Sequence, residues 1–386
     1  MRLPEFDVAV LGAGPAGATV AREMAATGAR TVLLEREHLP RCKSCAGGMP
    51  VRIERMLPFS IQSVIEDSVA GIQVSHRGQA RFDRLDAAPF AYMVMPDRFD
   101  KLLVDRAMEA GAELFDASPV LHIERESAGF SIRTAPGAIR SRLLVGADGA
   151  NSVVAHFSGL GAGLPETCAL ESEIRALLPA LARWRGLVNV DFGYRPSGYA
   201  WLFPKQRLLS VGLVRPRRFA PRRHQDLKRY LDHLGLGSAP IERIVGHKLL
   251  FRRAHERIAG ERVLLVGDAA GLVDEFTEEG IYYYAIRSGE IAARILRHAS
   301  DSNHGWIGAY NRAVDRELMP ELRAARTIAR LFYASLSRMP RAMLQISERV
   351  QYFWQAFFRV QRGDSGYDNE LRRAPIVAPL ARLRLR

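Results

Sequence analysis

Short apolar runs alternate with amphipathic stretches in the first part of the chain. Val8 to Leu11 has the pattern of a buried strand, Pro15 to Ala26 that of a helix, and Thr31 to Leu34 that of a second strand. Gly28 lies where a glycine commonly follows a helix end. Residues 97–111 show another amphipathic helix pattern. The order strand, helix, strand predicts a parallel sheet covered by helices.

The pattern changes along the rest of the chain. Leu143 to Val145 and Val263 to Val266 return to the buried-strand pattern, whereas residues 167–250 consist mainly of β-rich segments. A helix is predicted from about Glu279 to His298, and the remainder is predicted to be helical to about Arg362. The sequence therefore predicts an α/β protein with a second, mostly β domain and a C-terminal helical region.

A glycine-rich turn lies between the first predicted strand and helix, with the spacing Gly12-x-Gly14-x-x-Gly17. The first glycine permits a tight turn, the second lets a pyrophosphate approach the backbone, and the third allows close packing of helix on strand. Glu35 ends the next strand, where a carboxylate can accept hydrogen bonds from an adenosine ribose. This arrangement predicts nucleotide binding. Two neighbouring residues complete the predicted contacts: Ala16 and Arg36.

Two later turns favour FAD over NAD. Residues 146–149 (Gly-Ala-Asp-Gly) and 267–271 (Gly-Asp-Ala-Ala-Gly) each follow a predicted strand. Asp268 can accept hydrogen bonds from ribityl hydroxyls, and a helix that begins near Gly280 can direct its N-terminus at the pyrimidine edge of a flavin. The alternative is that the aspartates are turn residues or helix N-caps. Three motifs in this order predict one bound FAD, with these further contacts: Asp148, Gly267, Asp268, Gly280 and Ile281.

Over about residues 5–300, the three motifs resemble the p-hydroxybenzoate hydroxylase-like flavoprotein superfamily. The resemblance implies a Rossmann-like FAD-binding domain interleaved with a β-rich substrate domain, plus a C-terminal helical region. Arg98 falls where that superfamily often places a flavin-contacting arginine; the alternative is a solvated residue at a helix start. The chain is expected to divide as follows: FAD-binding domain 1–75, 97–165 and 258–300; substrate domain 76–96 and 166–257; C-terminal helical region with a basic tail 301–386.

Two further segments resemble the geranylgeranyl reductase family. The loop at residues 41–50 (Arg-Cys-Lys-Ser-Cys-Ala-Gly-Gly-Met-Pro) is similar to the Cys-x-Gly-Gly loop that the family places beside the flavin. Residues 199–204 (Tyr-Ala-Trp-Leu-Phe-Pro) match the family's Tyr-x-Trp-x-Phe-Pro strand at all four defined positions. Residues 278–282 (Glu-Glu-Gly-Ile-Tyr) are also similar. The chain departs from the family pattern in the additional Cys42 and in Ala46, where a glycine is more usual.

This resemblance implies a pocket for a prenyl chain. Residues two apart in a strand face the same side, so Tyr199, Trp201 and Phe203 would line a single apolar wall. The alternative is that these aromatic side chains form an ordinary sheet core. We predict substrate contacts from Tyr199, Trp201, Phe203 and Pro204, and catalytic roles for Tyr199 and Trp201 together with Cys45.

Saturation of an unactivated alkene requires a hydride from the flavin and a proton from the other side. A free thiol titrates near ~8.5, so Cys45 would be mostly protonated at neutral pH and able to donate. The resemblance also implies flavin contacts from Cys45, Ala46 and Gly47. The alternative for Cys45 is a small buried hydrophobe. A disulfide between Cys42 and Cys45 would remove the proton donor.

The net charge and the composition limit the classes of binding partner that we expect. The formal net charge is +13, which suits an anionic membrane surface or an acidic partner. No nucleic-acid-binding pattern accompanies this charge, so we expect no nucleic acid partner. The three cysteines and the lack of a signal-peptide pattern predict a cytoplasmic protein, and no spacing of His, Cys, Asp or Glu predicts a metal site.

An apolar stripe on a predicted C-terminal helix suggests a peripheral location on the inner face of the membrane. A basic tail with too little apolar content to fold alone follows it, and contains Arg372, Arg373, Arg382, Arg384 and Arg386. The alternative is that the stripe packs on the protein's own domains. The stripe consists of Met343, Ile346, Val350, Phe353, Phe357 and Val360.

Together these features predict an FAD-dependent reductase that saturates C=C bonds of a prenyl chain in a lipid, quinone or chlorophyll precursor. The electron donor is open between NADPH and ferredoxin, because no second nucleotide fingerprint follows a strand. One alternative is an FAD-dependent monooxygenase or halogenase of the same fold. An alternative of another class is a non-catalytic flavoprotein that acts as an electron carrier or assembly factor.

Overall fold

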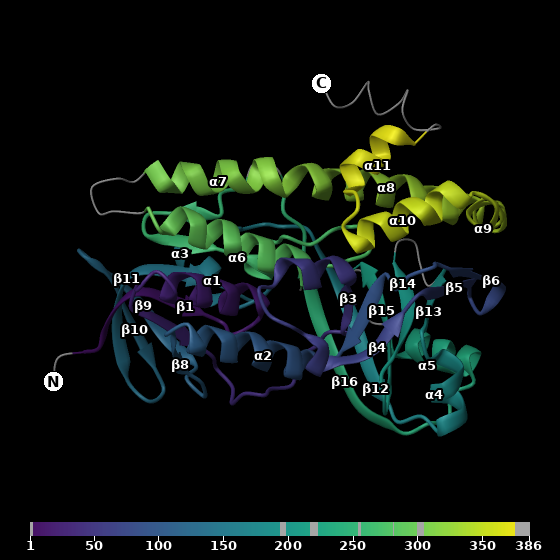
Figure 1. The fold of residues 1–386 in the computed structure, drawn as a ribbon, viewed down its shortest axis with the longest axis horizontal. Helices are drawn as coiled ribbons and strands as arrows, with labels where there is room; N and C mark the ends of the chain where they lie inside the picture. Colours follow the sequence, from purple (N-terminus) through teal and green to yellow (C-terminus); the bar gives the residue numbers. More distant parts are fainter. Residues whose placement is uncertain are drawn as a thin grey trace.

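A mostly parallel sheet forms around the first predicted strand (Figure 1). The computed structural model describes residues 3–193, 198–216, 223–253, 256–280, 282–298 and 305–374. The pairs that join β18, β11, β1, β2 and β8 are all parallel, as the buried apolar runs predicted. The strand order is β17 (Ala259–Gly260), β18 (Val263–Leu265), β11 (Ala138–Gly146), β1 (Glu5–Leu11), β2 (Thr31–Leu34) and β8 (Glu113–Phe115). Antiparallel strands extend from β11: β10 (Gly129–Thr134) and β9 (Val120–Glu126).

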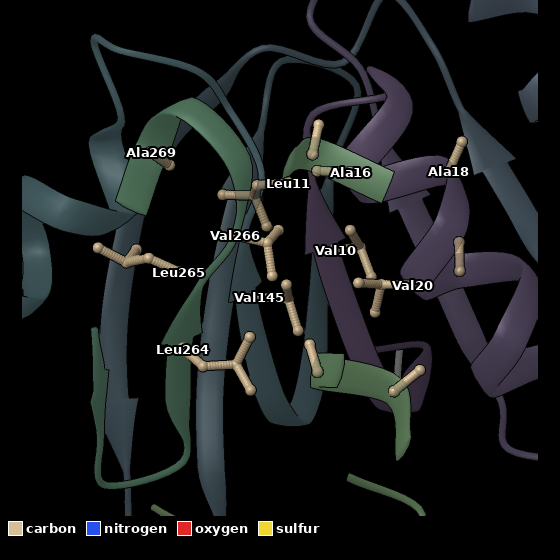
Figure 2. Close-up of a cluster of buried hydrophobic side chains, with 14 of the residues drawn as sticks. Val10, Leu11, Ala16, Ala18, Val20, Val145, Leu264, Leu265, Val266 and Ala269 are labelled. Carbon is tan, nitrogen blue, oxygen red and sulfur yellow. The ribbon is translucent and has the colours of Figure 1, made fainter. Parts of the chain in front are cut away.

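Small and branched side chains join this sheet to its helices. Figure 2 shows Val10, Val145 and Leu264 of the strands in one buried cluster with Ala16 of α1 (Pro15–Ala25). α6 (Tyr283–Leu296) packs on α1 so closely that a Cβ at Gly289 would lie 2.8 Å from the Ala16 carbonyl oxygen. The other helices packed around this sheet are α2 (Pro96–Glu109), α3 (Val153–Ser158) and α7 (Gly305–Glu317). The glycine turn is therefore held between buried neighbours.

The segment predicted to be β-rich forms a second sheet. Two helices, α4 (Leu178–Trp184) and α5 (Arg223–Leu234), pack on one face of it. The expected domain boundary between residues 75 and 76 falls at the end of β5, inside this sheet. The strand order is β16 (Ile241–Leu250), β12 (Glu166–Ile174), β15 (Leu209–Pro216), β14 (Tyr199–Pro204), β13 (Leu187–Phe192), β5 (Gly71–His76) and β6 (Gln79–Leu85).

A small antiparallel sheet follows the loop that contains Cys45. Its strands are β3 (Gly48–Pro50), β7 (Ala91–Val94) and β4 (Ile65–Val69). The Val94 amide donates a hydrogen bond of 2.8 Å to the Gly47 carbonyl oxygen, which anchors the end of the loop to β7. Two short 3-10 helices follow β3 in the chain: η1 (Val51–Met56) and η2 (Gln62–Val64). A third, η4 (Gly267–Ala270), is formed by the third glycine motif.

Helices of the C-terminal region cover the second sheet on the face opposite α4 and α5 (Figure 1). They are α8 (Met319–Arg338), α9 (Pro340–Arg349), α10 (Gln351–Arg362) and α11 (Tyr367–Arg373). Trp354 of α10 meets Phe82 of β6 edge to face, with the ring centroids 5.9 Å apart. Among the described helices, none is both long enough and apolar enough to cross a bilayer.

Two expectations for this region need correction. The predicted apolar stripe lies on two helices, because the backbone leaves the helical conformation at Val350 (φ −85°, ψ 89°). Residues 367–373 are not an unfolded tail: they form α11, whose Tyr367 and Leu371 are buried against α8. The local sequence has little apolar content, but tertiary packing stabilises this helix. Residues 375–386, the rest of the predicted basic tail, lie outside the described residues.

Candidate active site

The three glycines of the first turn have three different surroundings. Gly12 has φ +101°, and a Cβ there would lie 2.4 Å from the Ala147 carbonyl oxygen. A Cβ at Gly17 would lie 1.9 Å from the Gly12 carbonyl oxygen. At Gly14 the nearest heavy atom would be Arg41 Nη2, 3.9 Å away. Space for a pyrophosphate is thus left beside Gly14, at the N-terminus of α1, whose first turn contains no acidic residue.

Glu35 lies beside this turn, as predicted for a ribose-binding carboxylate. It is 4% exposed, and its Oε2 accepts a hydrogen bond of 3.1 Å from the Ala13 amide. Arg41 Nε lies 2.9 Å from the same oxygen, and Arg41 Nη1 lies 3.0 Å from Asp100 Oδ2. The sequence did not single out Arg41. Arg36 has a 76% exposed side chain and pairs with Glu37 instead.

The two motif aspartates differ in their contacts. Asp148 Oδ2 accepts from the amides of Val153 (2.7 Å) and Val154 (3.3 Å), so Asp148 holds the start of α3. Asp268 Oδ2 lies 3.2 Å from Nε2 of His247, a residue of β16. Asp268 Oδ1 is buried and has no hydrogen-bond partner among the described residues. A free buried carboxylate oxygen of this kind suits a ribityl hydroxyl.

The helix predicted to begin near Gly280 begins at Tyr283. Its first amides are taken by a side chain, because Glu279 Oε1 accepts from Tyr283 (2.7 Å) and Tyr282 (3.3 Å). Burial raises the pKa of Glu279 to about 7. Gly280 is packed tightly, since a Cβ there would lie 2.5 Å from Val273 Cγ2. Ile281 lies outside the described residues.

The cysteine loop, residues 41–47, places Cys45 beside Tyr282. The two side chains are 3.2 Å apart, Sγ to Oη, and the Gly47 amide donates to Sγ at 3.3 Å. Burial raises the pKa of the Cys45 thiol, so the thiol is protonated at neutral pH. Cys42 is an exposed free thiol that contacts Arg243. The structure therefore shows two separate thiols in this loop.

A large cavity lies between Cys45, the second sheet and the C-terminal helices. Tyr199, Trp201 and Phe203 line one wall, which we call the aromatic wall, as the alternation predicted. The opposite side comes from α8, α9 and α10 and includes Phe332, Leu344, Phe353 and Phe357. The lining is mostly apolar. Ala46, Gly47 and Gly280 also line the cavity, whereas Pro204 is buried and is not part of the lining.

One hydrogen bond and contacts between rings fix the aromatic wall. The Tyr199 hydroxyl donates to the Thr277 carbonyl oxygen at 2.6 Å, so its ring is held in place. Trp201 is 5% exposed, and its Nε1 has no hydrogen-bond partner among the described residues. The ring centroids of Tyr199 and Trp201 lie 6.1 Å apart, and those of Trp201 and Phe203 lie 6.4 Å apart. The three rings form one continuous apolar surface.

Several charged residues of the site were not predicted. Glu171 of β12 lines the cavity, and burial raises its pKa to about 7. Lys205 directly follows the aromatic strand, is 5% exposed, and donates to the Ala46 carbonyl oxygen at 2.7 Å. A charged residue at the end of the aromatic motif was the available signal for Lys205; no sequence pattern marks His247 or Glu171.

Arg98 does not line the cavity. Its side chain is 62% exposed and lies 2.8 Å from Glu66. Both residues line a separate surface hollow, which also includes Lys205, Arg175 and Glu242. The geometry matches the solvated alternative for Arg98.

Comparison with known proteins assigns the family. Residues 5–174 match the family model described as an FAD binding domain. A digeranylgeranylglycerophospholipid reductase of Thermoplasma volcanium is 30% identical over 344 residues, which span 80% of this chain and 83% of the relative. The chain belongs to the geranylgeranyl reductase family. Its cofactor is FAD, and the open space at Gly14 and the free oxygen of Asp268 fit that cofactor.

A further relative supports this reductase-family assignment, and a solved structure shows the same fold. A chloroplastic geranylgeranyl diphosphate reductase of Arabidopsis thaliana is 28% identical over 363 residues, spanning 86% of this chain and 75% of the relative. The crystal structure of a geranylgeranyl bacteriochlorophyll reductase-like protein from Thermoplasma acidophilum has a TM-score of 0.80 at 23% identity, covering 96% of this chain and 99% of that one. The predicted fold class is confirmed.

Proposed function

We propose that this reductase-family protein saturates C=C bonds of a prenyl chain bound in the cavity, with Cys45 as the proton donor. The observation that carries the proposal is a protonated thiol that lines a mostly apolar cavity with an aromatic wall. The named relatives act on a digeranylgeranyl phospholipid and on geranylgeranyl diphosphate, and these substrates share the prenyl chain. Bound FAD would supply the hydride.

The residues of the chain have separable tasks in this proposal. Tyr199, Trp201 and Phe203 hold the chain and exclude water, because burial of apolar surface favours binding by roughly 25 cal/mol per Å². The Tyr199 hydroxyl is already engaged with Thr277, so Tyr199 acts through its ring position. Cys45 gives its proton to one alkene carbon while the hydride goes to the other, which leaves a thiolate and a saturated bond.

The proposed function is tested with a panel of prenyl substrates. The purified protein is reduced with dithionite under anaerobic conditions and incubated with prenyl alcohols, diphosphates, quinones and phospholipids. A mass gain of one H₂ per saturated bond supports the proposal. Products that gain oxygen when air is admitted would favour the monooxygenase alternative. No product from any substrate, with FAD bound, would favour the electron-carrier alternative.

We further propose that an anionic membrane surface contacts the outer face of α8 and α9. Leu344 and Ser347 of α9 line the cavity, while Ile346 on the same helix is 53% exposed. Met339, between α8 and α9, is 61% exposed. The flanking arginines are exposed as well: Arg338, Arg341 and Arg349. A single helix thus separates the cavity from an apolar and basic outer face, which suits a substrate dissolved in lipid.

A further inference from the structure

Lys205 lies between two spaces that are separate in the structure. On one side its ammonium group donates to Ala46, the residue after Cys45, and a Cβ at Gly47 would lie 2.5 Å from Lys205 Nζ. On the other side Lys205 lines the surface hollow that it shares with Glu66 and Arg98. Cys45 lines the cavity. Lys205 therefore links the surface hollow to the cysteine loop.

The proposed function requires that Cys45 be reprotonated after each saturated bond. Each saturated bond converts the thiol to a thiolate, and the apolar cavity then holds substrate in place of water. The thiol must regain a proton before the next bond can be saturated. Lys43 is not available for this step, because its ammonium group lies 2.9 Å and 3.0 Å from the two oxygens of the buried Asp100 carboxylate.

We propose that Lys205 relays protons from the surface hollow to the Cys45 thiolate. One N–H bond of the Lys205 ammonium breaks as the S–H bond of Cys45 forms, which leaves a neutral amine. Water in the surface hollow then gives a proton to the amine, and the hydroxide that remains is neutralised by the solvent, which supplies the one proton consumed per saturated bond. The relay rests on the proposed function of Cys45, adds no oxidant or reductant, and leaves each group as it was before the turnover.

The charges around Lys205 fit this role. Burial lowers the pKa of Lys205 to about 8, against the opposing effect of Cys45, Glu171, Glu66 and Glu173. Burial raises the pKa of the Cys45 thiol. The two shifts run in the direction that favours proton transfer from the ammonium to the thiolate. The other charged groups of the surface hollow are Arg98, Arg175, Arg207 and Glu242.

Glu171 supports the same arrangement from the cavity side. Its Oε1 accepts from the Ser210 hydroxyl at 2.9 Å, and its Oε2 is buried with no hydrogen-bond partner among the described residues. The Glu171 carboxylate favours the charged form of Lys205.

The kinetic test separates the first turnover from later ones. In Lys205→Met the first bond should be reduced at nearly the normal rate, because Cys45 begins protonated, and later turnovers should slow at least tenfold. Lys205→Arg should be slow in the same way, because arginine keeps its charge and does not release a proton. Ethylamine added to Lys205→Ala should restore later turnovers. Lys101→Met, at a half-buried lysine paired with Asp105, serves as the charge control.

A second measurement needs neither FAD nor substrate. In a Cys42→Ser, Cys168→Ser background, the rate of Cys45 alkylation by iodoacetamide is followed against pH. Lys205→Met should slow alkylation several-fold near pH 8, and Lys101→Met should not. Unchanged alkylation, full activity of Lys205→Arg, or equal slowing of first and later turnovers would each overturn the relay. Lys205-dependent alkylation without any prenyl product would instead refute the proposed function, while showing that the charge of Lys205 acts on the Cys45 thiol.

Discussion

The Cys45 sulfur lies 3.2 Å from the Tyr282 hydroxyl oxygen, although the two residues are 237 positions apart in the chain. Tyr282 is 1% exposed and directly precedes α6, a helix packed on the nucleotide-binding sheet. The contact therefore fixes the thiol relative to that sheet as well as to its own loop. The position of the proposed proton donor depends on both the cysteine loop and the start of α6.

Cys45→Ala should keep FAD and lose most alkene reduction. The expected loss is ~10²–10⁴-fold, the usual contribution of a positioned general acid. Cys42→Ala is the matched control, because Cys42 is exposed and contacts Arg243 rather than the cavity. Flavin absorbance and product formation are measured on both variants. Equal activity of Cys45→Ala and the unaltered protein would show that the thiol only fills space.

The rate of the first turnover should not change at mildly alkaline pH. Because burial raises the pKa of Cys45 above the ordinary value near ~8.5, the donor stays protonated and the rate should stay level up to about pH 8. The rate should fall as the pH rises through the pKa of the Cys45 thiol in the folded protein. Tyr282→Phe removes a hydrogen bond that lowers this pKa, so its fall should occur at higher pH. Rapid-mixing measurements across the alkaline range test this; a shift to lower pH contradicts it.

Replacing the two motif aspartates should affect two different properties: protein stability for Asp148 and FAD affinity for Asp268. Asp148→Ala removes the acceptor of the first two amides of α3, those of Val153 and Val154, and should lower the free energy of unfolding by ~1 kcal/mol, with FAD affinity retained. Asp268→Ala should weaken FAD binding about tenfold or more, since a hydrogen bond to a charged group contributes ~1.5 kcal/mol or more. Urea unfolding and flavin fluorescence titration measure the two effects. A weaker FAD affinity in Asp148→Ala would return that residue to the cofactor site.

Ile346→Asp and Met339→Asp should weaken binding to anionic liposomes, and added salt should weaken binding of the unaltered protein. Leu178→Asp is the matched control, because Leu178 is 81% exposed on α4, on the other face of the second sheet. Sedimentation with liposomes of defined phosphatidylglycerol content measures binding. If all three variants bind equally, or if the unaltered protein does not bind, the membrane contact is refuted.

Much of the cofactor half could be predicted because its signals are local. Gly12, Gly14 and Gly17 report backbone requirements that a few neighbouring residues impose, and the structure places a strand before them and a helix after them. The aromatic wall was also predictable, because strand alternation alone puts Tyr199, Trp201 and Phe203 on one side.

The rest depended on contacts between distant segments. Periodicity predicts that one face of a helix is buried, but it does not identify the element on which that face packs. The apolar side of α10 packs on the second sheet and lines the cavity. Arg41, His247 and Glu171 reach the site through loop geometry and strand pairing, which no local pattern encodes. Asp148 and Asp268 look alike in sequence, and only the folded chain shows that one holds a helix and the other keeps an oxygen free.

The parallel pairing of β18 with β11 has a consequence for biosynthesis. The sheet that begins with β1 is completed by residues 263–265, and the second sheet takes strands from residues 71–85 and from residues 166–250. During translation, the early strands of both sheets therefore remain without those pairing strands that are synthesised much later. Such long-range pairing slows folding and leaves strand edges exposed in the meantime. We expect the nascent chain to need chaperone protection until the second half has emerged.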